Sequence, residues 1–319
     1  MSWADRLQSV FVAAAALVGL AIGAATPVGE YGGFVVIPAL LVMLTAVFVQ
    51  LDAAHVGEVR QARGLVGASL ALNYLFTPAL AWSLGAGLLG GQPDLRIGLL
   101  LLLVTPCTDW YLVFTAIARG HTGIAAALVP VNLVLQLVLL PVYVLLLGGD
   151  AAMVGVGTLA EAVLLMLAVP LVSAFLLRWW ARRVKGDLWR ERRLNGCAAR
   201  VVVPLLCLAV LSMFAWQAPV VIDHGTELVL LLPALVVFFV VLPLVATASS
   251  RVLGLSGPQR VTLTMVSTAR NSPIALGVAV AAFPDRPLIA VALVVGPLVE
   301  LPVLAVLAQV VRHREPQRL

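Results

Sequence analysis

Charged side chains are scarce in this sequence: Asp, Glu, Lys and Arg make up 11% of its 319 residues, while 62% are hydrophobic. A soluble globular domain has roughly 25% charged and about 45–50% apolar residues. The shortage of charge excludes that class and predicts an all-α polytopic membrane protein. Since no hydrophilic stretch is long enough for a second, soluble domain, we expect residues 1–319 to form a single integral membrane unit.

Cysteines and enzyme motifs are also sparse. The three cysteines, Cys107, Cys197 and Cys207, lie in or beside apolar stretches, and an odd number so placed gives no disulfide framework. The sequence lacks zinc-ligand spacings, phosphate-binding glycine loops and a Ser–His–Asp arrangement. We therefore expect no metal site, no cofactor and no enzymatic activity.

What the sequence does have is long apolar segments, and a membrane-spanning helix needs about 20 such residues. The N-terminal segment resembles a signal peptide, but we interpret it as a first membrane helix because it completes a symmetric set of ten. The ten predicted spans are 8–26, 33–51, 65–90, 97–118, 123–148, 157–177, 197–218, 228–249, 261–283 and 288–311.

The positions of the basic residues predict the orientation. With both termini in the cytoplasm, sixteen of the twenty Lys and Arg face inside and only Arg96 and Arg286 face outside. Residues 178–193 are strongly basic and rich in Trp, as expected of a cytoplasmic loop beside anionic lipid. The pattern predicts a multi-pass protein of the inner (plasma) membrane and gives no reason to expect a nucleic-acid partner.

The ten segments divide into two sets of five, residues 8–148 and 157–311. An odd number of spans in each set makes the second set inverted relative to the first, an arrangement typical of secondary transporters. The fourth segment contains "TPCTDW" and the ninth contains "STARNSP". Each interruption is followed by an apolar stretch, a polar turn and a helix with an early proline, Pro130 or Pro297. This shared order supports two inverted five-helix repeats.

Pro106 and Pro273 are expected to break the fourth and ninth helices, because proline lacks an N–H and clashes with the carbonyl four residues earlier. Irregular backbone at membrane depth survives only where it faces protein or a water-filled cavity. A single proline of this kind predicts no more than a kink. Two at matching positions, flanked by polar groups, favour an ion or solute site.

The ionisable residues best placed at membrane depth are Asp109, Arg270 and Glu300. A charge at the centre of a bilayer costs roughly 2.5–3.5 kcal/mol on insertion scales and normally marks function. If the broken helices cross, Asp109 and Arg270 meet, either as a pair that changes partners during transport or as a static ion pair. Glu300 could relay a proton or bind a cation. We expect the substrate site to be lined by Cys107, Thr108, Asp109, Arg270, Asn271 and Ser272.

Paired amides lie on other segments. Asn132 and Gln136 share one face of the fifth helix, where they could supply cation-binding oxygens or interhelical hydrogen bonds. Asn73 and Thr77 show the same spacing, and for them we expect helix packing. The thiol of Cys107, inside the first break, could be a soft ligand for a thiophilic solute.

Several motifs resemble the bile acid:sodium symporter superfamily, and in particular its branch of arsenite efflux permeases. They are "PCT" at Pro106–Thr108, "GPLVELPVL" at Gly296–Leu304 and "LNYLFTPALAW" at Leu72–Trp82. The resemblance implies ten helices, with the broken fourth and ninth helices crossing in a core domain beside a panel domain. It also implies alternating access, with efflux of arsenite or a related oxyanion in exchange for protons. The bile-acid branch implies instead import of organic anions with sodium.

This chain departs from the arsenite branch in having Asp109 in the first break and Arg270 in the second. A guanidinium at the crossing would take the electrostatic role of a bound cation, so we hypothesise that Arg270 stands in for a sodium ion and pairs with Asp109 when the site is empty. The expected partners are a small anionic or metalloid solute, the lipid bilayer, and a proton or sodium. A different class of function, a non-transporting membrane scaffold or sensor, would use the same breaks as structural crossings.

Overall fold

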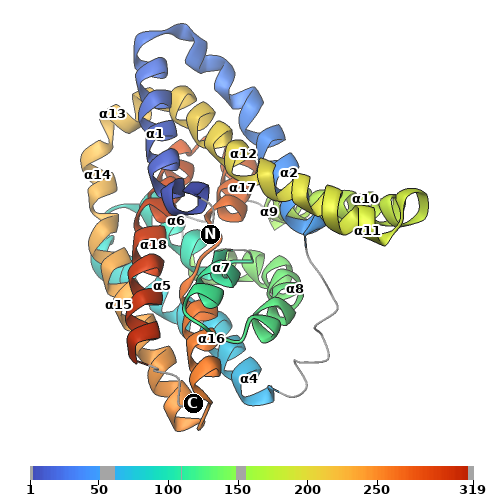
Figure 1. Ribbon diagram of the computed structural model, residues 1–319. Helices are drawn as coiled ribbons and strands as arrows, with labels where there is room; N and C mark the ends of the chain where they lie inside the picture. The colour runs from blue at the N-terminus through green and yellow to red at the C-terminus, as the bar shows by residue number, and fades with distance from the viewer. Residues whose placement is uncertain (1–2, 51–61, 109, 149–155, 315–319) are drawn as a thin grey trace. The chain divides into compact units, whose positions relative to one another are not determined.

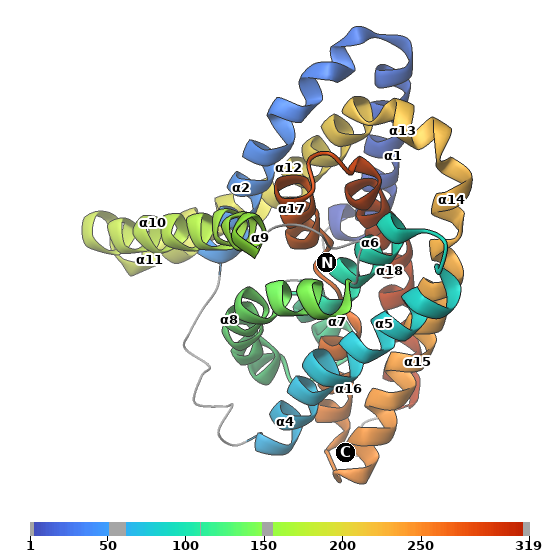
Figure 2. The same cartoon turned by 180° about the vertical axis from the view of Figure 1, so that it is seen from behind.

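The structure is a computed structural model that describes residues 3–50, 62–108, 110–148 and 156–314 (Figures 1 and 2). Within these ranges every named element is a helix. Six helices are long and apolar enough to span a membrane, or seven if the bent pair Thr122–Gln136 and Val138–Leu147 counts as one span. The predicted class, an all-helical polytopic membrane protein, agrees with this. The ten spans and their inverted repeat stay predictions.

The long candidate spans agree with predicted segments. They are Gly29–Val49, Arg63–Leu88, Gly157–Lys185, Arg190–Trp216, Gly225–Val252 and Pro287–Val311. The predicted first segment is helix α1, Trp3–Ala25. The predicted fourth and ninth segments are each divided into two shorter helices, as the prolines led us to expect.

The chain divides into two compact units. The first unit comprises residues 1–51, 153–228 and 273–298, and the second comprises residues 52–152, 229–272 and 299–319. Each unit draws on both predicted repeats, so the division does not follow the repeat boundary.

In the first unit, α12 (Asn195–Trp216) packs against both α1 and α2 (Gly32–Val49). A short 3₁₀ turn, η1 (Pro27–Tyr31), joins α1 to α2. Gly19 and Gly23 of α1 lie directly against the backbone of α12, with the four-residue spacing that lets membrane helices approach closely. Also in this unit are α9 (Val156–Val163), the π-helical turn η5 (Leu164–Ala168), α13 (Ala218–Asp223), and most of α14 (Gly225–Val229) and α17 (Ser272–Ala282).

The basic segment 178–193 is helical, so the predicted loop is wrong. Helix α10 (Val169–Lys185) continues through its arginines and ends at Gly186, whose φ of 84° favours glycine. The chain then turns back through α11 (Asp187–Trp189) and the π-helical turn η6 (Arg190–Leu194). We call residues 178–194 the basic hairpin. Arginine is a good helix former, which explains why α10 does not stop at the end of its apolar run.

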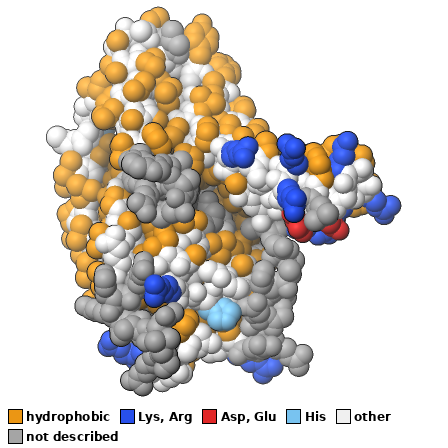
Figure 3. Space-filling view, viewed as in Figure 1, with side chains coloured by type: hydrophobic (Ala, Val, Ile, Leu, Met, Phe, Trp, Pro, Cys, Tyr) orange, Lys and Arg blue, Asp and Glu red, His pale blue; other side chains and the backbone are white. Residues whose placement is uncertain are grey.

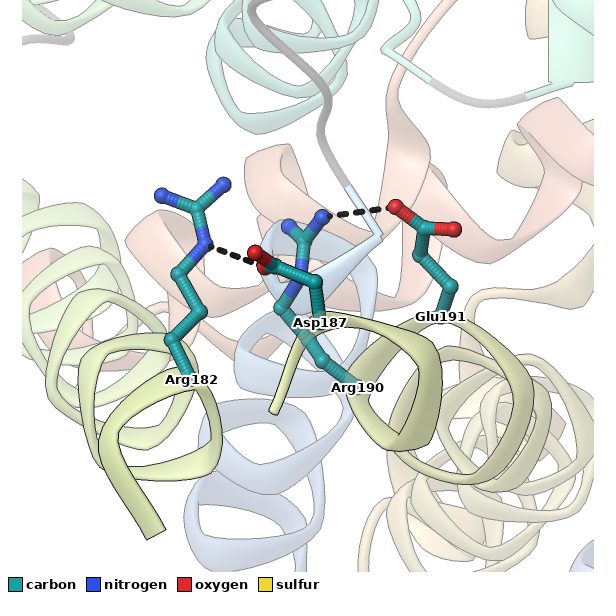
Figure 4. Close-up of polar contacts among 4 residues, drawn as sticks. All are labelled: Arg182, Asp187, Arg190 and Glu191. Atoms are coloured by element: carbon teal, nitrogen blue, oxygen red, sulfur yellow. Dashed lines mark hydrogen bonds and ion pairs between the residues drawn. The ribbon is translucent and has the colours of Figure 1, made fainter. Parts of the chain in front are cut away.

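Ion pairs fasten the tip of the basic hairpin. The Asp187 carboxylate forms ion pairs with Nε of Arg182 at 3.2 Å and with Nε of Arg190 at 3.5 Å, and Arg190 also pairs with Glu191 at 3.1 Å (Figure 4). Figure 3 shows Lys and Arg side chains spread over this hairpin with the acidic groups beside them. A cluster of positive charge of this kind suits an anionic lipid surface.

The second unit contains α4, α5, α6, α7, α8, α15 and α16. Their bounds are Arg63–Ala71, Thr77–Leu88, Pro93–Val104, Trp110–Ile117, Thr122–Leu147, Leu231–Val252 and Gly257–Thr268. A π-helical turn, η3 (Leu72–Phe76), joins α4 to α5, and the end of α18 (Pro287–Arg314) also belongs here. Helix α16 contacts α4, α7, α8 and α15 (Figure 2), which explains why residues Val261–Thr268 are all buried.

A candidate solute site at the crossing of two broken helices

The two breaks lie against each other in the second unit. Helix α6 ends at Val104 and α16 ends at Thr268. The backbone N–H of Cys107 donates to the carbonyl of Ala269 at 3.1 Å, and that of Asn271 donates to the carbonyl of Thr105 at 2.8 Å. These two bonds form an antiparallel bridge between Pro106 and Arg270. Backbone groups that lose their helical partners are costly to leave unpaired in hydrocarbon. Here each break supplies a hydrogen-bond acceptor for a backbone N–H of the other. The two breaks are therefore in direct contact.

The side chain of Arg270 is buried at this crossing, with 1% of its surface exposed. One terminal nitrogen donates to the carbonyl of Leu103 at 2.7 Å, and the other donates to Oδ1 of Asn73 at 2.8 Å and to the carbonyl of Ser267. Nε donates to the carbonyl of Thr268 at 3.3 Å. Acceptors in a fixed arrangement thus hold the guanidinium in one orientation.

Two more groups surround Arg270. The guanidinium carbon lies 5.3 Å from the ring centroid of Phe238 on α15, within cation–π range. Oε1 of Glu300 on α18 accepts the backbone N–H of Arg270 at 2.7 Å. The structure therefore brings Glu300, for which the sequence predicted a proton relay or a cation ligand, to the crossing.

Polar side chains of the two breaks also bond to each other. Nδ2 of Asn271 donates to Oγ1 of Thr108 at 2.9 Å. Cys107 is fully buried, and Ser272 is buried with its hydroxyl unpartnered among the described residues. Of the predicted substrate-binding residues, Cys107, Thr108, Arg270, Asn271 and Ser272 are thus collected at one place.

A second polar cluster lies on α8 of the same unit. Asn132 and Gln136 are both buried, and the hydroxyl of Tyr74 donates to the main-chain oxygen of Asn132 at 2.9 Å. Within the described residues, Nδ2 of Asn132 and both polar atoms of Gln136 have no hydrogen-bond partner. Directly after Gln136 the helix bends by 51°. Buried amides without partners are rare in stable cores, so this cluster has unused capacity to bind a polar ligand.

Comparison with known proteins adds the family. A model described as the Sodium Bile acid symporter family matches residues 37–224, more than half of the chain. This chain belongs to that family. It is 26% identical over 289 residues to the arsenical-resistance protein Acr3 of Corynebacterium glutamicum, covering 86% of this chain and 78% of that protein. It is 25% identical over 337 residues to Acr3 of Alkaliphilus metalliredigens, covering 98% and 94%. An uncharacterized transporter of Synechocystis is 24% identical over 266 residues, covering 80% and 69%.

The symporter family consists of membrane transporters rather than enzymes, and its members move solutes across a membrane. Among the residues that the structure describes for this symporter-family chain, no group of three or more His, Cys, Asp or Glu could hold a metal ion. Membership of this family implies a small solute and a membrane setting for the chain.

Asp109 lies outside the described residues, so its proximity to Arg270 stays a prediction. Sequence reasoning missed Asn73, for which we predicted only helix packing, and its neighbour Tyr74. In this symporter-family protein Asn73 binds the guanidinium while Tyr74 binds Asn132, so η3 connects the two polar clusters. π-Helical turns are frequent at functional sites. The signal available in the sequence was an amide inside an apolar span.

Proposed function

We propose that this chain is a secondary transporter that exports arsenite or a related oxyanion in exchange for protons, by alternating access. Two relatives are named arsenical-resistance proteins. The first break carries Cys107, a buried thiol, and thiols are the soft ligands that thiophilic solutes prefer. Thr108, Asn271 and Ser272 would complete the solute site, with Asp109 beside them.

The bridge between the breaks is the single observation that carries the proposal. It places irregular backbone, a guanidinium and a carboxylate together in a family of membrane transporters. Discontinuous helices of this kind coordinate substrates and coupling ions in secondary transporters. A scaffold or sensor would not need buried polar groups without partners, and within the described part of the chain those of Gln136 have none.

Proton coupling is assigned to Glu300, with Asp109 as its partner at the first break. Asn132 and Gln136 would supply oxygens for a coupling ion or for water on its path. The surrounding architecture is proposed to be ten helices in two inverted repeats, with a core and a panel domain. The protein would lie in the plasma membrane with both termini in the cytoplasm.

Arsenite tolerance in a sensitive host tests the substrate. The wild-type chain should confer tolerance, and Cys107→Ser should lower it although protein levels are unchanged. The matched control is Cys207→Ser, which alters a half-buried thiol of the first unit and should leave tolerance intact. In proteoliposomes, an imposed proton gradient should drive arsenite movement and a sodium gradient should not.

A wild-type chain that confers no tolerance would contradict arsenite as the substrate. The alternative is then an organic-anion symporter, which the description of the matched family supports. Uptake of a labelled bile acid into proteoliposomes under a sodium gradient distinguishes it. If neither solute moves in folded, reconstituted protein, the scaffold or sensor interpretation replaces transport.

A further inference from the structure

The surroundings of Arg270 are formed by the ends of two helices. Leu103 lies in the last turn of α6, and Ser267 and Thr268 end α16. The carbonyls of a last helical turn have no partner within the helix, and together they carry roughly half a negative charge. Two such ends point at one guanidinium. Their combined partial charge matches the single positive charge of Arg270.

The threonine hydroxyls near the two helix ends donate to carbonyls other than those that accept from Arg270. The hydroxyl of Thr105 donates to the carbonyls of Leu101 at 2.7 Å and Leu102 at 3.1 Å, whereas the carbonyl of Leu103 accepts from Arg270. The hydroxyl of Thr268 donates back to Thr264 at 2.7 Å. Near the helix ends, the carbonyls of Leu101 and Leu102 thus accept a hydroxyl and that of Met265 accepts the N–H of Ala269. The carbonyls of Leu103, Ser267 and Thr268 accept from the guanidinium.

Every hydrogen-bond acceptor described around the guanidinium is an oxygen. Main-chain carbonyls come from Leu103, Ser267 and Thr268, and an amide oxygen comes from Asn73. Carbonyl and amide oxygens of this kind replace the hydration shell of alkali cations in membrane proteins. The carboxylate of Glu300, on the backbone N–H of the same residue, adds negative charge.

We propose that the space between the C-terminal ends of α6 and α16 is a monovalent-cation site that Arg270 fills permanently. The guanidinium is attached to the chain, so it stabilises the crossing as a bound sodium ion would but cannot be released. The proposal deepens the coupling part of the proposed function. It rests on that function in one respect, namely that transport by the wild type needs no sodium at this place. Unlike the hypothesis drawn from the sequence, it does not require Asp109.

Removing the guanidinium should therefore create a sodium site. Arg270→Ala leaves the oxygen ligands in place and opens room for an ion with water. It also leaves Glu300 and two negative helix ends without a cation in a buried place, where uncompensated charge is costly. A sodium ion that enters this space removes that cost and should stabilise the folded protein.

The test is thermal unfolding of purified protein in detergent, with NaCl exchanged for choline chloride at constant ionic strength so that screening is unchanged. Wild type should unfold at the same temperature in NaCl as in choline chloride. Arg270→Lys keeps a tethered cation, so its unfolding temperature should also be independent of the salt. Arg270→Ala should unfold at a lower temperature in choline and regain stability in a saturable way as sodium is added. A folded Arg270→Ala protein that is indifferent to sodium overturns the proposal, as does a wild type with an equal sodium response.

A second variant keeps the proposal testable if Arg270→Ala fails to fold. In Arg270→Ala/Glu300→Gln both charges are removed, so this protein should fold without added sodium and respond to it at least tenfold more weakly than Arg270→Ala. Arg270→Ala that yields no folded protein even when expressed and purified in sodium contradicts the proposal. No substrate is added in these measurements, so a wild type that moves no arsenite refutes the proposed function and leaves this inference standing.

Discussion

Arg270 and Asn73 are 197 residues apart in the sequence, yet a terminal nitrogen of the guanidinium lies 2.8 Å from Oδ1 of the amide. This bond connects η3 to the second break. Tyr74, the next residue, donates to Asn132 on α8, and its own carbonyl accepts from the hydroxyl of Tyr143 at 2.7 Å. A displacement of η3 would therefore alter hydrogen bonds in both polar clusters, at Arg270 and at Asn132.

Asn73→Ala should destabilise the protein. The substitution removes one acceptor from a buried guanidinium, and a hydrogen bond to a charged group contributes about 1.5–3 kcal/mol. The expected result is a lower unfolding temperature in detergent, followed by tryptophan fluorescence. Ser83→Ala on α5 is the control, because the exposed Ser83 hydroxyl donates within its own helix, to the carbonyl of Ala79 at 2.8 Å. Equal effects of the two substitutions would contradict the role given to Asn73.

The breaks could be located from the sequence because proline acts on its own helix. Pro106 has no N–H wherever it stands, so the end of a helix near it follows from local chemistry. The same holds for the polar run of the second break. That the two breaks meet was predicted only through their matching order in the two repeats.

The ligands of Arg270 could not be predicted in the same way. Three are main-chain carbonyls, which every residue has, so nothing in the side chains of Leu103 or Ser267 marks them. Asn73 looked like a packing residue because its partner lies on a distant segment. The basic hairpin was predicted as a loop because charge marked the end of the membrane span, whereas the helix of α10 continues beyond that span.

Glu300→Gln should separate folding from coupling. A glutamine keeps an oxygen that can accept the Arg270 backbone N–H, so the unfolding temperature should change little. It cannot exchange a proton, so solute movement in proteoliposomes should stop responding to a proton gradient. Glu161→Gln, at an exposed residue of α9, is the matched control and should keep that response. Persistent proton coupling in the Glu300 variant would assign the proton to another group.

Gly19→Ala should loosen α1 from α12. A Cβ atom at Gly19 would lie 2.2 Å from the main-chain oxygen of Leu211, and backbone cannot rotate away as a side chain can. Overpacking of this kind costs about 1–3 kcal/mol. Gly67→Ala is the control, since an added Cβ on α4 meets nothing within 4 Å and should stabilise the helix by about 0.5–1 kcal/mol. Opposite shifts of the unfolding temperature are expected, and shifts of the same sign would exclude the close approach.

Gln136→Met should make the protein more stable and less active. Gln136 is buried, with 1% of its surface exposed, and both of its polar side-chain atoms lack a hydrogen-bond partner within the described residues. An unsatisfied buried group costs about 1–3 kcal/mol, and a methionine of similar shape removes that cost. If the amide binds a coupling ion or its water, the unfolding temperature should rise while solute flux in proteoliposomes falls. Binding sites often keep groups that lower the stability of the folded protein because the function needs them. Greater stability with undiminished flux would therefore show that Gln136 is a packing residue and not a binding residue.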